Sequence, residues 1–304
     1  MTKINLNKNF WKWATFFTMS FIWGASFILI KKGLLAYSPL QSGALRMVFA
    51  STFFAPIAIK RLKLLNKNNL LVLLIVGLLG NFIPAFLFAY GETKLISTVA
   101  SMLNSTTPIF TMIIAIAFFS IKVNFFNIIG LLIGFVGTLG LISKNGFLSF
   151  SGFNLGAIVI LIATILYGIN TNFVRNFNNG LDGLSIASLS FFLIGPLAYT
   201  SFFCSNLTDV YHSPFFWQST ISIALLAFFG SFWANIMFNI FVIKTNAILA
   251  SSVTYVIPVF SLFWGILDGE KISFIHIISS IIIFFGITLV NKKEKVLSFV
   301  YAKK

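Results

Sequence analysis

Apolar residues occur along this chain in long continuous runs. They lack both the alternation typical of half-buried strands and the one-sided spacing of a surface helix. Runs of about 20 apolar residues match the length that an α-helix needs to cross a bilayer. The chain divides into ten such segments with short connections, at residues 13–31, 41–59, 69–90, 97–119, 125–142, 153–174, 184–204, 218–241, 247–267 and 273–290. We therefore predict an all-α integral membrane protein with ten transmembrane helices.

Composition supports this prediction. Hydrophobic residues make up 58% of the 304 residues and charged residues only 9%, too few to cover the surface of a soluble protein. The first apolar run is too long for the core of a cleaved signal peptide, so we interpret it as a retained helix. The single cysteine, Cys204, excludes an intramolecular disulfide and a Cys-rich metal site.

The basic residues predict the topology. With the N-terminus inside, the cytoplasmic segments hold fifteen Lys and Arg and the opposite side five, which is the bias expected of cytoplasmic loops. We predict an inner or plasma membrane protein with both termini, residues 1–12 and 291–304, in the cytoplasm. We attribute the net charge of +15 to these basic cytoplasmic segments. No basic stripe lies on a soluble face, so nucleic-acid binding is not expected.

The second half of the chain repeats the first. Lys94, Ala100, Ser101, Pro108 and Phe110 recur with unchanged spacing as Lys244, Ala250, Ser251, Pro258 and Phe260. Further identities pair Gly80 with Gly230, Phe82 with Phe232 and Phe88 with Phe238, and Trp23-Gly24 parallels Tyr167-Gly168. The halves thus cover residues 13–142 and 153–290, with five helices each. Since five is odd, the second repeat must be inverted, as in many transporters.

At these residues the sequence resembles the drug/metabolite transporter superfamily, of the EamA type. The resembling stretches are WGASFILIK at 23–31, ALR at 44–46, ASMLNSTTPIFT at 100–111, ASSVTYVIPVFS at 250–261 and DGEKIS at 268–273. The first half departs from the family pattern at 118–124, where FFSIKVN replaces an acidic link. The resemblance implies ten helices and export of an amino acid or a similar metabolite.

Polar and aromatic residues within the spans are the candidate substrate contacts. An amide that faced lipid would leave donors and acceptors unpaired, so such residues should face the bundle interior or a wet cavity. The predicted substrate-binding residues are Trp23, Asn81, Asn104, Tyr167, Asn170, Trp233, Asn235 and Tyr255. The alternatives are hydrogen bonds between helices for the amides and an interfacial belt for the aromatics. Most of the 39 Phe are expected to face lipid or to fill the core.

Two prolines and one arginine also lie inside the spans. Pro108 and Pro258 occupy matching positions and are predicted to kink their helices, either to set packing angles or to free a carbonyl for a ligand. Arg46 lies several positions into the second span. It either attracts an anionic carboxylate or phosphate, or bonds carbonyls near a helix end, and we favour the structural alternative.

Signatures of enzymes and cofactors are missing. His212 and His276 have no nearby carboxylate pair, and we find no metal-ligand spacing, phosphate-binding glycine loop or nucleophile elbow. We expect no enzyme activity, no cofactor and no metal. The six acidic residues lie near the ends of apolar runs or between them. Without a mid-span carboxylate to bind a proton, facilitated diffusion, exchange, or coupling through non-carboxylate groups is favoured over proton-driven export of cationic drugs.

These observations predict a secondary transporter. It would move a small organic metabolite through a cavity between its halves by alternating access across the lipid bilayer. The alternatives are a non-transporting membrane scaffold or sensor, and a multidrug exporter of the same superfamily. Gly130, Gly134 and Gly137 at helical small-residue spacing indicate close helix packing or a homodimer.

Overall fold

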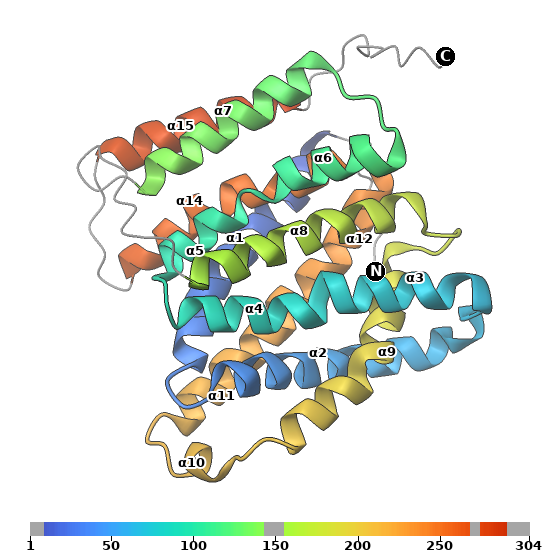
Figure 1. The fold of residues 1–304 in the computed structure, drawn as a ribbon, viewed down its shortest axis with the longest axis vertical. Coiled ribbons are helices and arrows are strands. Elements are labelled where there is room, and N and C mark those ends of the chain that lie inside the picture. The colour runs from blue at the N-terminus through green and yellow to red at the C-terminus, as the bar shows by residue number, and fades with distance from the viewer. Residues whose placement is uncertain (1–8, 143–154, 268–273, 291–304) are drawn as a thin grey trace.

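A computed structural model describes residues 9–142, 155–267 and 274–290, and within these ranges it contains helices and no strand (Figure 1). Each predicted segment corresponds to one helical pass, and four passes are built from a pair of helices joined by a break or by a π-helical stretch. In order they are α1 (Asn9–Gly33); α2 (Pro39–Arg61); α3 (Lys67–Gly77), η2 (Leu78–Phe82) and α4 (Ile83–Glu92); α5 (Ser97–Asn104) and α6 (Thr107–Phe119); α7 (Phe125–Ile142); α8 (Leu155–Asn176); α9 (Gly183–Phe203); α11 (Phe216–Leu225), η3 (Leu226–Trp233) and α12 (Ala234–Lys244); α13 (Ala247–Ser251) and α14 (Val253–Leu267); and α15 (Phe274–Val290). Two short helices, η1 (Leu62–Leu64) and α10 (Thr208–Tyr211), lie in the connections.

Eight of the passes are long and apolar enough to cross a membrane, and α7 and α15 contribute two shorter apolar helices. The prediction of an all-α, ten-helix membrane fold is therefore confirmed. The basic tail at 291–304, most of the N-terminal segment 1–12 and the DGEKIS link at 268–273 lie outside the described residues.

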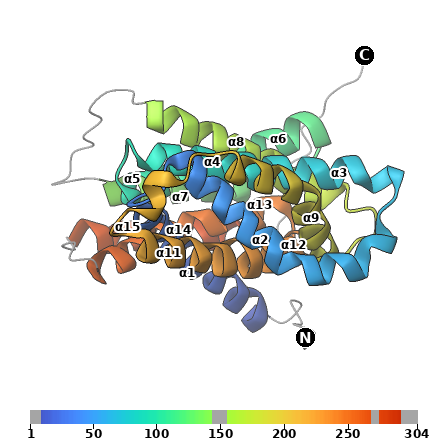
Figure 2. The same cartoon turned by 90° about the horizontal axis from the view of Figure 1, so that it is seen from below.

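The two halves interlock as inverted copies. Their first helices, α1 and α8, lie on opposite faces of the bundle (Figure 2), and each packs against the fourth pass of the other half, α14 and α6 respectively. At the first crossing a Cβ added to Gly24 would lie 2.6 Å from the Cβ of Phe260, and at the second a Cβ on Gly168 would lie 3.1 Å from the backbone of Phe110. The glycine of each repeat thus packs against the phenylalanine of the other repeat.

The fifth helix of each half forms a separate pair at one edge of the bundle, where α7 lies along α15 (Figure 1). A Cβ on Gly130 would lie 2.6 Å from the carbonyl oxygen of Gly286, and one on Gly137 would lie 2.9 Å from Ile283. The small-residue spacing of α7 therefore lets two helices of the same chain approach closely. A homodimer remains a prediction.

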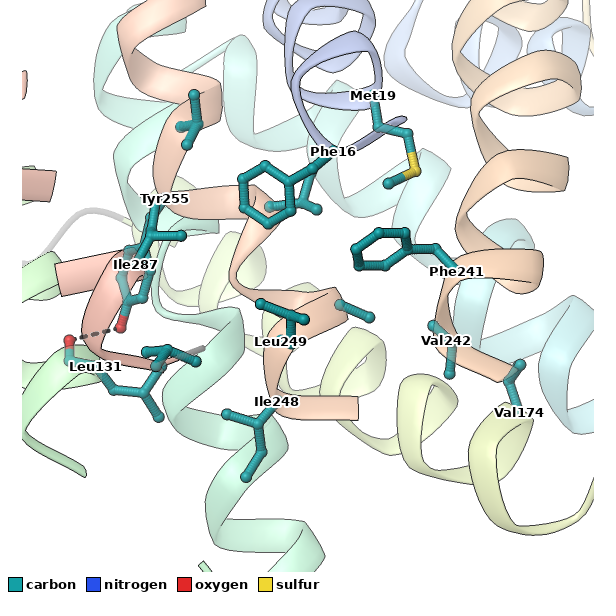
Figure 3. Packing of buried hydrophobic residues seen from close by; sticks show 14 of the residues in the cluster. Phe16, Met19, Leu131, Val174, Phe241, Val242, Ile248, Leu249, Tyr255 and Ile287 are labelled. Carbon is teal, nitrogen blue, oxygen red and sulfur yellow. Dashed lines mark hydrogen bonds between the residues drawn. The ribbon is translucent and has the colours of Figure 1, made fainter. Parts of the chain in front are cut away.

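A large apolar cluster fills the end of the bundle where α1 begins, which we call the N-terminal end. We call five of its residues the apolar plug: Phe16, Met19, Val174, Phe241 and Leu249 (Figure 3). Successive passes alternate in direction, so α8 and α12 end, and α13 begins, at this same end. All five plug residues are at most 3% exposed, so the N-terminal end of the bundle is closely packed.

Candidate functional site

A cavity lies between the two halves, farther from the N-terminal end than the apolar plug. Its volume is about 90 Å³, several times what a single water needs, which fits a small solute better than a packing defect. Its lining residues are Trp23, Ser26, Phe27, Ile30, Arg46, Met47, Gly80, Asn81, Phe88, Asn104, Thr107, Tyr167, Asn170, Thr171, Gly230, Asn235, Phe238, Ser251, Thr254 and Ile257.

Most of the cavity wall consists of residues that the repeat relates to one another. Trp23 and Tyr167 are repeat partners, and so are Phe88 and Phe238. Trp23 packs edge-to-face on Phe238 with ring centroids 5.3 Å apart, while Tyr167 stacks on Phe88 at 5.8 Å. Both distances are in the favourable range for aromatic pairs. Each half therefore contributes one aromatic pair made across the junction, and the cavity lies on the pseudo-two-fold axis.

The third and eighth passes are locally π-helical where they meet the cavity, in η2 and η3. Each stretch contains one glycine of the repeat, and each glycine makes room for a polar side chain of the opposite half. A Cβ on Gly80 would lie 2.4 Å from the Asn170 amide, and one on Gly230 would lie 3.1 Å from Ser26 Oγ. π-Helical turns are frequent at functional sites, and these two place polar groups in the cavity wall.

Amide side chains connect the two halves at the cavity. Asn235 donates to Asn81 Oδ1 at 2.6 Å, and Asn239 donates to Asn235 Oδ1 at 2.7 Å. Asn170 Oδ1 is buried and has no hydrogen-bond partner among the described residues. An unpaired buried acceptor costs free energy, so this amide keeps a capacity for hydrogen bonding that the fold does not use.

The two prolines act on the cavity indirectly, since neither lines it. Proline lacks an N–H, which frees the carbonyl four residues earlier. The carbonyl that Pro258 frees belongs to Thr254, and it accepts a hydrogen bond from Ser105 Oγ at 2.9 Å. The carbonyl that Pro108 frees belongs to Asn104, and it accepts from Thr107 Oγ1 at 2.7 Å. Both carbonyls are thus satisfied within the protein.

Six of the eight predicted substrate contacts line the cavity, namely Trp23, Asn81, Asn104, Tyr167, Asn170 and Asn235. Whether they bind a substrate remains a prediction. The placement of the other two at the cavity was wrong. Trp233 is 41% exposed, on the outer face of the π-helical stretch, and Tyr255 is fully buried, with its hydroxyl donating to Leu131 O at 2.8 Å. For Trp233, an extra residue per π-turn changes which side chains face inward, and the sequence pattern does not reveal this. Tyr255 instead lies in α14 and packs against α7 through its bond to Leu131.

Several lining residues were missed from the sequence. Ser26 is the repeat partner of Asn170, and Thr254 is the partner of Asn104, so the repeat itself would have found both. Phe27, Phe88 and Phe238 line the cavity and are exceptions to the lipid contact and core filling expected of most phenylalanines. The identity of Phe88 and Phe238 in the repeat was the available signal.

Arg46 reaches the cavity from α2 and donates from Nε to Ser231 Oγ at 2.8 Å. Among the described residues Arg46 forms no hydrogen bond to a helix-end carbonyl; its bond to Ser231 joins α2 to η3 beside the cavity, and the choice between a structural and a binding role remains a prediction. The described acidic residues lie at helix ends or in connections, with Glu92 closing α4, Asp182 capping α9 and Asp209 in α10. Among the described residues no group of three potential metal ligands occurs.

Two interlocked five-helix halves around a central polar and aromatic cavity define a multi-pass membrane protein with the architecture of a transporter. The chain belongs to the EamA-like transporter family, which matches it twice, over residues 11–143 and 154–292. The resemblance to EamA-type transporters is thereby confirmed.

Individual relatives support the same class. An uncharacterized transporter of Archaeoglobus fulgidus is 27% identical over 286 residues, covering 93% of this chain and 99% of the relative. The uncharacterized inner membrane transporter YedA of Escherichia coli K12 is 25% identical over 279 residues, covering 90% and 89%. A solved crystal structure of a protein with 17% identity superposes with a TM-score of 0.69 over 91% of this chain and 94% of the other, and it shows a shared fold.

Proposed function

We propose that this protein is a secondary transporter that carries a small organic metabolite, an amino acid or a similar compound, through the central cavity. The observation that carries the proposal is the cavity itself, which lies between inverted halves and is built from the first, third and fourth passes of each half together with α2. Related transporters place their substrate sites at such a junction. Rocking of the halves would expose the cavity to each side in turn, and we infer that the net direction is export.

We further propose an inner or plasma membrane location with both termini in the cytoplasm. The excess of basic residues at the N-terminal end supports this orientation, and one relative is named an inner membrane transporter. In this orientation the apolar plug closes the cytoplasmic side, and the cavity lies nearer the outer side.

Coupling by facilitated diffusion or exchange fits the placement of the acidic residues best. No carboxylate lies in the middle of a pass in the described part of the chain, so the proton-and-drug competition of many multidrug exporters has no obvious carrier there.

Metabolite release tests the proposal. Cells overexpressing the protein should accumulate one or a few small metabolites in the medium, and an Asn104→Ala variant should lose most of that release. Asn104 is 6% exposed and faces the cavity. The matched control is Asn68→Ala, because Asn68 is an exposed asparagine in the first turn of α3.

Each outcome separates the alternatives. Release that Asn104→Ala lowers and Asn68→Ala spares supports transport through this cavity. Equal release from wild type and Asn104→Ala would overturn the cavity assignment. A correctly folded protein that released nothing, and that moved no solute after reconstitution into liposomes, would instead support a scaffold or sensor.

A further inference from the structure

Arg46 supplies the only charged side chain that lines the cavity in the described structure. A guanidinium group carries five N–H donors. In Arg46 only Nε–H has a partner among the described residues, the hydroxyl oxygen of Ser231. Ser231 is 2% exposed, so it holds the side chain from within the protein wall. The donors on the two terminal nitrogens have no partner in the described part of the chain.

No carboxylate neutralises Arg46 by direct contact. Of the described residues, Arg61 forms an ion pair with Asp182, at 2.7 Å, but none forms one with Arg46. Glu92 attracts Arg46 electrostatically, yet it does not line the cavity, and its carboxylate accepts a hydrogen bond from Ser97 at 3.0 Å. A cation in a membrane interior without a contact partner is costly, which makes a transient anionic partner the natural complement.

Arg46 also breaks the symmetry of the cavity. Much of the wall comes in repeat-related pairs, such as Trp23 with Tyr167. By contrast, α2 contributes Arg46 and Met47, while α9, its counterpart in the second half, contributes no lining residue. The positive charge therefore lies on one side only, and it would orient a bound solute with its anionic group towards α2.

We propose that Arg46 is a specificity-determining residue that binds a carboxylate of the transported solute through its terminal nitrogens. The planar fork of a guanidinium matches the two oxygens of a carboxylate. A phosphate would bring about −1.5 to −2 charges at neutral pH to a wall with a single cation, so a carboxylate fits better. This inference rests on the proposed transport function and narrows its substrate class.

Equilibrium binding to the purified full chain tests the inference with three probes of similar size. L-Leucine and 4-methylpentanoate carry a carboxylate, and L-leucinamide carries an amide in its place. Binding is followed by the shift in melting temperature with probe concentration, which reports affinity for the folded state. Both carboxylates should bind wild type, and L-leucinamide should bind about tenfold more weakly or worse.

Variants assign the effect to Arg46. Arg46→Gln should lose the preference for carboxylate over amide, whereas Arg46→Lys should keep the preference with weaker binding, because a lysine retains the charge but not the fork. Arg61→Gln is the matched control on the same helix, outside the cavity, and should leave probe binding unchanged. Melting without probe checks that each variant is folded.

The inference is overturned if folded Arg46→Gln binds 4-methylpentanoate as tightly as wild type, if L-leucinamide binds wild type as well as L-leucine does, or if neither carboxylate binds wild type. Flux across liposomes is measured separately. Arg46-dependent binding without flux would overturn the proposed transport and leave the carboxylate site standing. Flux that is the same in wild type and Arg46→Gln would support transport and overturn the carboxylate site.

Discussion

At the scale of single residues, the fold depends on glycines at the crossings of the two halves. A Cβ added to Gly24 would lie 2.6 Å from the Cβ of Phe260 and 3.0 Å from the backbone of Phe260. Backbone cannot rotate aside as a side chain can. The crossing of α1 and α14 is therefore set by the absence of a side chain at this position.

We expect Gly24→Ala to lower the free energy of unfolding by about 1–3 kcal/mol, the usual cost of overpacking. The measurement is the melting temperature of the purified protein in detergent. Gly195→Ala is the comparison, because its new Cβ would meet Ser51 at an ordinary 3.4 Å, and it should lower the melting temperature less than Gly24→Ala does. Equal melting temperatures for Gly24→Ala and wild type would contradict the tight crossing.

Asp182 is a second residue with a defined contribution, at the N-cap of α9. Its carboxylate accepts from the backbone N–H of Ser185 at 2.7 Å and pairs with Arg61 at 2.7 Å. Partial burial works against ionisation, but the hydrogen bonds from Ser185 and Arg61 and the charge of Arg61 outweigh it and hold the pKa of Asp182 below its usual value. A lowered pKa in the folded state means that ionised Asp182 stabilises the fold.

Asp182→Ala should therefore cost about 1 kcal/mol near neutral pH. The stabilisation is fully present above the unfolded pKa, about 3.9, and is lost as the pH falls through the lower folded value. Unfolding measured against pH should show the difference between wild type and Asp182→Ala shrinking below about pH 4. Asp182→Asn is the control that keeps a capping oxygen but does not titrate. If wild type remained more stable than Asp182→Ala by the same amount in acid, ionised Asp182 would not be the source of the stabilisation.

At the scale of elements, helices are broken at corresponding places in the two halves. The fourth and ninth passes are each divided, between α5 and α6 and between α13 and α14, and a proline follows each break. Ser105, on the fourth pass, donates to the carbonyl of Thr254 on the ninth. The defect that Pro258 creates in one half is thus satisfied by a side chain from the other.

This linkage predicts a coupling. Ser105→Ala should cost about 1 kcal/mol in the wild type, because it leaves the carbonyl of Thr254 without its partner. In a Pro258→Ala background the same change should cost much less, since the restored N–H can bond to Thr254 within the helix. Unfolding of all four proteins gives the coupling energy. Equal costs in both backgrounds would show that the bond to Ser105 does not compensate for Pro258.

The elements themselves were accessible from the sequence, and their local irregularities were not. Long apolar runs and a repeat of eight matched residues predicted ten passes in two inverted halves. Hydrophobicity, however, does not predict the π-helical stretches η2 and η3. Trp233, the last residue of η3, is 41% exposed. The sequence also does not reveal that Ser231, 185 residues away, binds Arg46 at the cavity wall.

At the scale of the whole molecule, the proposed orientation can be tested with the native Cys204, an exposed residue at the end of α9. Because α9 starts at the N-terminal end, Cys204 lies at the opposite, proposed outer end. A membrane-impermeant maleimide should label it in intact cells or spheroplasts. Leu64→Cys in a Cys204→Ser background should be labelled only after permeabilisation. The reverse pattern would invert the topology.

The apolar plug has a role in the same picture, since alternating access requires the packed N-terminal end to open. Phe16 of α1 and Phe241 of α12 come from different halves, and their ring centroids lie 6.2 Å apart.

We expect Phe16→Cys with Phe241→Cys, in a Cys204→Ser background, to be joined by a short cleavable thiol cross-linker. The joined protein should lose flux of the released metabolite in liposomes and regain it after reduction, because the link holds the two halves together at this end. Each single-cysteine variant treated with the same reagent is the control. Undiminished flux through cross-linked protein would mean that this end stays closed during transport, and the moving parts would then have to be sought elsewhere in the bundle.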